Sequence, residues 1–346
     1  MSAISNHMVE DDYHKEAKPY IWRGPALPEL PISNAKFEEK PLNLTDVRTL
    51  AEEDRPKLDT HGFCFVDHKS ETVADVHNDN DAAPYVDEMA DFLKNFLGVE
   101  TVIGFNARAR SVNPDHKITP VSIEAHIDTN KDNVWASVSR PLTEDERDLV
   151  RSGKLRARVF NIWRPRVTHA EDFPLAVCDP NTLDVNRDII MLDNATPETL
   201  AELSYVRHSP EHKWYWLSNQ TPDEFILFTQ SDSHPPKGQF RNDFNHVPHS
   251  AFRNEAARPG CPQRQSIEAR FIVLEPAPYS PPVRNPSNRP PPETRRMPYT
   301  EHIQAPHALT AEAPAPASKE DRGVRLGTYV AKKVELKSVP VAVKAN

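Results

Sequence analysis

Proline most limits what this chain can fold into, because it donates no backbone hydrogen bond and restricts the residue before it. The sequence holds 34 prolines, and 12 of the 41 residues from Pro276 to Pro316 are proline. Such a segment suits neither a sheet nor a helix, so we expect residues 277–346 to be a largely extended or disordered tail. Five prolines between positions 19 and 41 similarly predict an extended N-terminal arm over residues 1–46. The packed core is therefore expected at residues 47–276.

The composition argues against several common functions. The net charge is -9, whereas nucleic-acid and membrane-surface proteins usually present a basic face. The nine glycines form neither G-x-G-x-x-G nor G-x-x-x-x-G-K, the usual phosphate-binding loops. No stretch approaches the ~20 apolar residues of a membrane span, and no apolar secretory signal is recognised at the N-terminus. Three widely spaced cysteines predict no disulfide framework and indicate a reducing, cytoplasmic setting.

Strand-like patterns outnumber helix-like patterns between residues 47 and 276. Helical spacing of apolar residues predicts a helix over residues 85–97, and a capping box predicts another over residues 143–152. A short charged helix is also expected over residues 47–58. Alternating, β-branched and aromatic residues predict strands at residues 61–67, 99–105, 119–128, 155–164, 213–217, 224–229 and 266–274. The pattern favours a mainly β domain with flanking helices.

The first candidate for chemistry is the tripeptide His126-Ile127-Asp128, within the expected strand 119–128. Side chains two residues apart on a strand point to the same side, so the imidazole and the carboxylate would converge. With a second histidine from a distant strand they would form the two-histidine, one-carboxylate face that binds Fe(II) and leaves positions open for a co-substrate and O2. A His–Asp hydrogen bond on a half-buried strand is the alternative, because the short motif is common by chance.

A segment that begins at His246 offers the other groups that such a site needs. His246 and His249 are both candidates for the distal histidine. Arg264 and Ser266 could bind a carboxylate through guanidinium and hydroxyl hydrogen bonds, as a metal-bound 2-oxo acid requires at its far end. Arg270 lies on the same face of the expected strand and competes for this role. Salt bridging at the surface is the alternative interpretation of both arginines.

Six segments, taken in order, resemble the fungal hydroxylase/desaturase family that includes gibberellin GA4 desaturase. They are also similar to the CmcJ-type cephamycin methoxylation component. The segments are residues 61–73, 126–129, 160–166, 172–184, 209–233 and 249–276. The resemblance implies a double-stranded β-helix, which is a cupin-like jelly roll. It also implies a non-haem Fe(II)- and 2-oxoglutarate-dependent dioxygenase.

The resemblance also implies roles for particular residues. His126, Asp128 and His249 match the family's iron ligands, and His249 is preferred to His246 because it heads the block HSAFR. Arg264 with Ser266 matches the R-x-S clamp for 2-oxoglutarate. Two features depart from the family. The segment GFNARAR at residues 104–110 replaces an expected F-x-H-T-x-R pattern, and the first and last iron ligands are 123 residues apart.

We therefore expect one catalytic domain at residues 47–276. It would hydroxylate or desaturate a small secondary-metabolite substrate, with Fe(II) and 2-oxoglutarate as cofactors and O2 as the oxidant. No nucleic-acid or membrane partner is expected, and the possibility of a homo-oligomer stays open. Two alternatives remain. One is an Fe(II) oxygenase or isomerase that works without 2-oxoglutarate, and the other is a non-catalytic β-barrel partner subunit.

Overall fold

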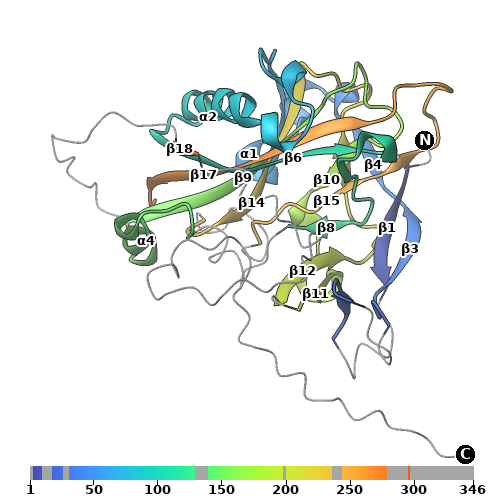
Figure 1. The fold of residues 1–346 in the computed structure, drawn as a ribbon, viewed down its shortest axis with the longest axis horizontal. Helices are drawn as coiled ribbons and strands as arrows, with labels where there is room; N and C mark the ends of the chain where they lie inside the picture. Colours follow the sequence, from blue (N-terminus) through green and yellow to red (C-terminus); the bar gives the residue numbers. More distant parts are fainter. Residues whose placement is uncertain are drawn as a thin grey trace, which may run out of the picture.

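The structure is a computed structural model that describes residues 3–9, 18–25, 31–128, 139–197, 200–235, 244–278 and 295–296. Two large β-sheets form successive layers, and helix α2 lies on the outer side of one of them (Figure 1). Most of the predicted tail, residues 277–346, lies outside the described residues, so its extended character stays a prediction. The same holds for the division of the chain at residues 46 and 276.

The first large sheet contains the longest strands of the described chain. Its order is β18-β6-β17-β9-β14-β5, and β7 pairs with β6. The strands are β5 (Phe63–Asp67), β6 (Thr101–Ser111), β7 (Thr119–Pro120), β9 (Leu155–Pro165), β14 (Glu224–Asp232), β17 (Gln265–Pro276) and β18 (Arg295–Arg296). Because β17 and β9 lie in the middle of this order, both of their edges are paired.

The second large sheet is built from shorter strands, in the order β2-β11-β12-β8-β15-β10-β13-β4. They are β2 (Tyr20–Trp22), β4 (Leu44–Asp46), β8 (His126–Ile127), β10 (Leu175–Cys178), β11 (Ile189–Ala195), β12 (Leu200–Val206), β13 (Trp214–Trp216) and β15 (His249–Ala251). A small third sheet has the order β16-β1-β3, formed by β16 (Arg253–Asn254), β1 (Ala3–Val9) and β3 (Lys36–Pro41). The predicted N-terminal arm thus contributes strands to two sheets.

Four α-helices and several short 3-10 turns connect or cover the strands in the described part of the chain. The α-helices are α1 (Leu58–His61), α2 (Ala83–Leu97), α4 (Glu144–Arg151) and α5 (Val185–Asp188). The 3-10 turns are Val47–Thr49, Glu52–Asp54, Val73–Asp75, Asp79–Asp81, Pro114–His116 and Pro180–Thr182. The predicted helices at residues 85–97 and 143–152 are confirmed. Thr143 and Glu146 form the expected reciprocal capping box at α4.

Alternation along β17 sets the two faces of the first sheet. Ile267, Ala269 and Phe271 are fully buried and pack with α2 in the largest apolar cluster. Glu268 and Arg270 alternate with them, so their side chains point away from α2, toward the second sheet. The face under α2 is therefore apolar, whereas the face toward the second sheet carries charged groups.

Two local predictions are wrong for identifiable reasons. The helix expected over residues 47–58 is two 3-10 turns followed by α1. The second turn ends at Asp54 because Pro56 holds the preceding residue Arg55 in an extended conformation with ψ 143°. The strand expected over residues 119–128 is split into β7, which pairs in the first sheet, and β8, which pairs in the second. The chain crosses from one sheet to the other between them.

Leu93 tests the packing of α2 on the first sheet. Its side chain is 0% exposed, so Leu93→Ala should lower the free energy of unfolding by about 2–5 kcal/mol through lost apolar contacts and a cavity. Urea denaturation followed by circular dichroism measures this change. The exposed Asn95 on the same helix is the control, and equal losses in Leu93→Ala and Asn95→Ala would contradict the packing described.

Candidate metal centre

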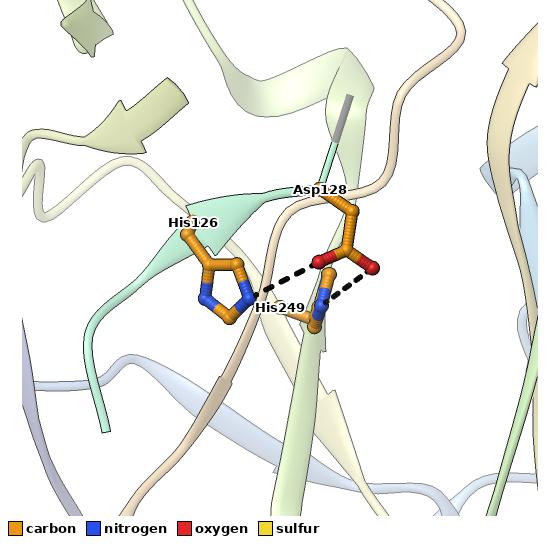
Figure 2. Close-up of side chains that lie close together, drawn as sticks. All are labelled: His126, Asp128 and His249. Atoms are coloured by element: carbon orange, nitrogen blue, oxygen red, sulfur yellow. Dashed lines mark ion pairs between the residues drawn. The ribbon is translucent and has the colours of Figure 1, made fainter. Parts of the chain in front are cut away.

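Three predicted site residues, His126, Asp128 and His249, lie together, as Figure 2 shows. His126 is on β8, Asp128 follows that strand, and His249 is on the neighbouring β15, where the register pairs it directly with His126. One potential ligand atom from each residue lies within 4.8 Å of the other two. Asp128 Oδ1 is 3.5 Å from His126 Nε2, and Asp128 Oδ2 is 3.7 Å from His249 Nε2. The arrangement is a compact two-histidine, one-carboxylate cluster.

Backbone carbonyls orient both imidazole rings. His126 Nδ1 lies 2.7 Å from the Glu124 carbonyl oxygen, and His249 Nδ1 lies 3.2 Å from the Val247 carbonyl oxygen. A carbonyl can only accept, so each Nδ1 carries the proton and each Nε2 keeps its lone pair in the neutral ring. Both Nε2 atoms face Asp128 (Figure 2). This orientation of histidines by carbonyls is typical of metal-ligating histidines.

The Asp128 carboxylate is held from the other sheet through one of its oxygens. Oδ2 accepts hydrogen bonds from Gln230 Nε2 at 2.6 Å and from Arg270 Nη2 at 2.8 Å. A second guanidinium nitrogen, Arg270 Nε, lies 3.2 Å from the same oxygen. Oδ2 is therefore saturated by donors, which leaves Oδ1 as the oxygen better placed to bind a metal ion.

The electrostatics favour an ionised Asp128 and a neutral His249, as metal binding requires. Burial alone would raise the pKa of Asp128, but the charges of Arg270 and the two histidines hold it well below its usual value. Burial, and secondly the neighbouring His126, lower the pKa of His249 to about 4. Burial opposes protonation of His126 as well, but its contact with Asp128 raises its pKa. At neutral pH, Asp128 is ionised and His249 is neutral.

His246, the alternative distal histidine, is not part of the cluster. Its buried ring has Nδ1 2.5 Å from the Gln230 carbonyl oxygen, and burial lowers its pKa to about 4. This contact fixes the backbone of the residue whose side chain holds Asp128. His246 therefore contacts the backbone of Gln230 rather than Asp128. His249 supplies the ring that faces the carboxylate.

The two candidate arginines have different surroundings, and neither is a surface group. Arg270 is already bonded to Asp128 and to Asn106 Oδ1, the latter at 2.7 Å, and it forms an ion pair with Glu268. Arg264 is only 2% exposed, and its guanidinium lies 4.8 Å from the centre of the Trp163 ring. The interpretation as a surface salt bridge is therefore wrong for Arg264, whereas Arg270 does form ion pairs, but with partners beside the cluster rather than at the surface.

The backbone N–H of Arg264 donates to the Asp172 carboxylate, but the guanidinium has only neutral hydrogen-bond partners among the described residues. Its Nε donates to Ser266 Oγ at 3.2 Å, and its Nη1 donates to the Phe173 carbonyl oxygen at 2.8 Å. Among the described side chains, no Asp or Glu lies within ion-pair distance of its guanidinium. Burial, and secondly the charge of Arg110, lower the pKa of Arg264 to about 9. A buried guanidinium without a counter-charge is costly, so this position suits an added carboxylate.

Sequence reasoning missed Gln230 and the role of Glu268. Glu268 pairs with Arg110 and Arg270 and thus belongs to the charged group beside Asp128. Its position could have been found, because Glu268 and Arg270 interrupt an otherwise apolar strand at a spacing of two residues. Gln230 carried no such signal, since its contact with Asp128 joins residues 102 positions apart.

A jelly-roll architecture with a two-histidine, one-carboxylate cluster is typical of non-haem Fe(II) oxygenases. A family model described as "Oxidoreductase/YMDC permease-like domain" matches residues 7–274, and the chain belongs to this family. No helix in the described ranges is both long and apolar enough to cross a membrane.

Curated proteins with similar sequences and a solved structure with a similar fold were also found. The "Hydroxylase/desaturase efuI" of Hormonema carpetanum is 28% identical over 69% of this chain and 85% of its own length. The "Alpha-ketoglutarate-dependent dioxygenase phiK" of a fungal species is 28% identical over 72% of this chain and 91% of its own length. The solved structure of the "iron and alpha-ketoglutarate-dependent endoperoxidase NvfI" superposes with a TM-score of 0.68 at 21% identity, covering 80% of this chain and 98% of that one.

These matches confirm two predictions. The resemblance to the fungal hydroxylase/desaturase family is confirmed, since a GA4 desaturase from Gibberella fujikuroi is also similar, at 26% identity over 48% of this chain. The double-stranded β-helix is confirmed by the structural match. The roles of individual residues are not settled by these similarities, so they depend on the geometry of this chain.

Gln230 tests how strongly the first sheet controls the candidate metal centre. Gln230→Leu removes the 2.6 Å hydrogen bond to Asp128 without changing charge, so it should weaken Mn(II) binding about 10-fold. Gln220→Leu is the matched control, because Gln220 is equally buried but donates to the Glu224 carbonyl oxygen instead. Calorimetric titration with Mn(II) measures both affinities, and equal affinities in the two variants would show that Gln230 does not position Asp128.

Proposed function

We propose that this protein is a non-haem Fe(II)- and 2-oxoglutarate-dependent dioxygenase in which His126, Asp128 and His249 bind the iron. Arg264, with Ser266, binds the far carboxylate of 2-oxoglutarate. The observation that carries the proposal is the convergence of three ligand atoms within 4.8 Å on two adjacent strands. The enzyme class and both cofactors predicted from the sequence are confirmed by the curated Fe(II)- and alpha-ketoglutarate-dependent relatives.

The donor set of the cluster fits Fe(II). Two imidazoles and one carboxylate form the ligand set on which non-haem Fe(II) enzymes keep open positions for a co-substrate and O2. Among the residues that the structure describes, neither Nε2 atom has a hydrogen bond that would compete for its lone pair, apart from the contacts with Asp128. The three residues would thus hold the ion from one side.

The surroundings of Arg264 fit 2-oxoglutarate. Its guanidinium is buried beside Ser266 Oγ, a combination that can donate several hydrogen bonds to one carboxylate. Arg270 is less suited to this role because Asp128, Glu268 and Asn106 already occupy its donors. We therefore assign the clamp to Arg264.

Fe(II) with 2-oxoglutarate supplies an oxidant that removes hydrogen from unactivated C–H bonds, as hydroxylation and desaturation require. The chain's own residues position the reactants and exclude water. Arg270 and Gln230 keep Asp128 ionised and oriented. The Phe228 ring lies 4.8 Å from the His249 ring, and Tyr205 is paired with His126 in the sheet. The Tyr205 ring lies 6.5 Å from the His126 ring, so each of the two histidines has an aromatic side chain beside it.

The substrate is a small molecule that reacts with O2, and we place it among secondary metabolites because the similar proteins include an "Aspirochlorine biosynthesis protein N" and a "Gibberellin cluster GA4 desaturase". A non-catalytic partner subunit is disfavoured because a complete ligand set is present.

We also assign the enzyme to the cytoplasm, since Cys64, Cys178 and Cys261 are all unpaired.

Removal of the iron ligands tests the assignment of the metal site. His126→Ala and Asp128→Asn should abolish succinate formation from 2-oxoglutarate, because each variant loses one of three ligands. Circular dichroism should show an intact fold in both variants. His77→Ala is the control, and it should retain full activity because His77 is exposed and is not a member of the cluster. Loss of the fold in His126→Ala and Asp128→Asn would instead indicate that these residues are structural.

The proposed carboxylate clamp makes a separate prediction. Arg264→Ala should raise the KM for 2-oxoglutarate about 100-fold, because a charged hydrogen-bonding partner is lost. Arg253→Ala is a suitable control, because Arg253 forms an ion pair with Glu39 at the surface. This variant should leave the KM for 2-oxoglutarate unchanged. Steady-state assays of succinate formation measure both values. An unchanged KM in Arg264→Ala would mean that another group holds the far carboxylate.

A further inference from the structure

Asn161 lies on β9 between two residues that each touch a candidate iron ligand. The register pairs Asn161 with Arg270 of β17 on one side and with Phe228 of β14 on the other. Residues paired in this way place their side chains on the same face of a sheet. Arg270 donates to Asp128, and the Phe228 ring contacts the His249 ring. The Asn161 side chain therefore faces the same space as the candidate metal centre.

The Asn161 amide is buried and lacks hydrogen bonds. The residue is 1% exposed, and neither Oδ1 nor Nδ2 has a partner among the residues that the structure describes. A buried amide without partners is destabilising, and more than nine in ten buried polar groups in folded proteins are satisfied. An unpaired amide that faces a proposed cofactor site indicates that a bound ligand supplies the missing partner.

The same face of β9 leads from Asn161 toward the proposed clamp. Trp163 follows two residues later, about 6.6 Å along the strand, and its indole nitrogen is also buried without a partner among the described residues. The Arg264 guanidinium lies over the Trp163 ring. A dicarboxylate that extends along β9 would thus have one end at Asn161 and the iron ligands, and the other end at Arg264.

We propose that Asn161 binds the 2-oxo acid end of 2-oxoglutarate, with Nδ2 donating to the carboxylate beside the oxo group. This inference rests on the proposed function and assigns a further cofactor-binding residue to the same site. Arg264 recognises the far carboxylate, whereas Asn161 recognises the end that binds the metal. The amide oxygen remains available to a water molecule or a substrate hydroxyl group.

Calorimetric titration of 2-oxoglutarate into the Mn(II)-loaded protein tests the proposal without turnover. Asn161→Leu keeps a similar volume and removes both polar atoms, so the Kd for 2-oxoglutarate should rise about 10-fold or more. Asn161→Asp keeps the shape and adds a charge that repels the carboxylate, so it should weaken binding as well. Mn(II) affinity should change little in Asn161→Leu because Asn161 is not a ligand and the substitution adds no charge.

Asn254 provides a matched control, because it is a buried asparagine whose amide is satisfied. Its Nδ2 donates to the Glu171 carbonyl oxygen at 2.9 Å, and its Oδ1 accepts from the Ala256 backbone at 3.0 Å. Asn254→Leu should therefore lower the melting temperature and leave the Kd for 2-oxoglutarate unchanged. Asn161→Leu should show the reverse pattern, with a ligand-free melting temperature that is unchanged or raised.

Visible absorption of the anaerobic Fe(II) protein identifies which end of 2-oxoglutarate is involved. At saturating 2-oxoglutarate, Asn161→Leu should shift the charge-transfer band, because a donor to the 2-oxo acid group is lost. Arg264→Ala should require more 2-oxoglutarate but give an unshifted band. An unchanged Kd and band in Asn161→Leu would overturn this inference alone. A wild-type protein that binds the metal but not 2-oxoglutarate would overturn the proposed function itself.

Discussion

The contact between the Asp128 carboxylate and the Arg270 guanidinium joins the two large sheets at the candidate metal centre. Asp128 follows a strand of one sheet, and Arg270 lies in the middle of the other. Breaking such a buried pair leaves an uncompensated charge, which costs about 3–5 kcal/mol. The pair therefore constrains the spacing of the sheets as well as the orientation of the carboxylate. Both effects require that β17 present charged side chains on one face and apolar side chains to α2 on the other.

Local patterns in the sequence predicted the main helix and the long strands of the fold. The helix α2 was predictable because its apolar residues repeat at helical spacing and Gly98 ends it in a left-handed conformation. The strands β9, β14 and β17 were predictable because they are long and rich in β-branched and aromatic residues. Most strands of the second sheet were missed. The strands β2, β4 and β15 have only three residues each, which carry too little pattern to distinguish them from loops, whereas β11 and β12 were missed although each has seven residues.

The candidate site was predictable to the extent that its residues are close in sequence or follow a known motif. His126 and Asp128 are two positions apart, and the block that starts with His249 indicated the third member of the cluster. The two side chains were expected to converge because both would lie within one long strand. This explanation was only partly right, because Asp128 lies just beyond β8. The contacts of Arg270, Gln230 and Asn161 depend on strand register, which a single sequence does not specify.

The most direct test of this account is an anaerobic titration of the purified apoprotein, first with Fe(II) and then with 2-oxoglutarate, followed by visible absorption. The account predicts a weak charge-transfer band that appears only when both are present, because His126, Asp128 and His249 leave positions on the iron for the 2-oxo acid. Bound iron without a band after 2-oxoglutarate is added would contradict the proposed co-substrate. A protein that binds no iron would contradict the metal centre itself.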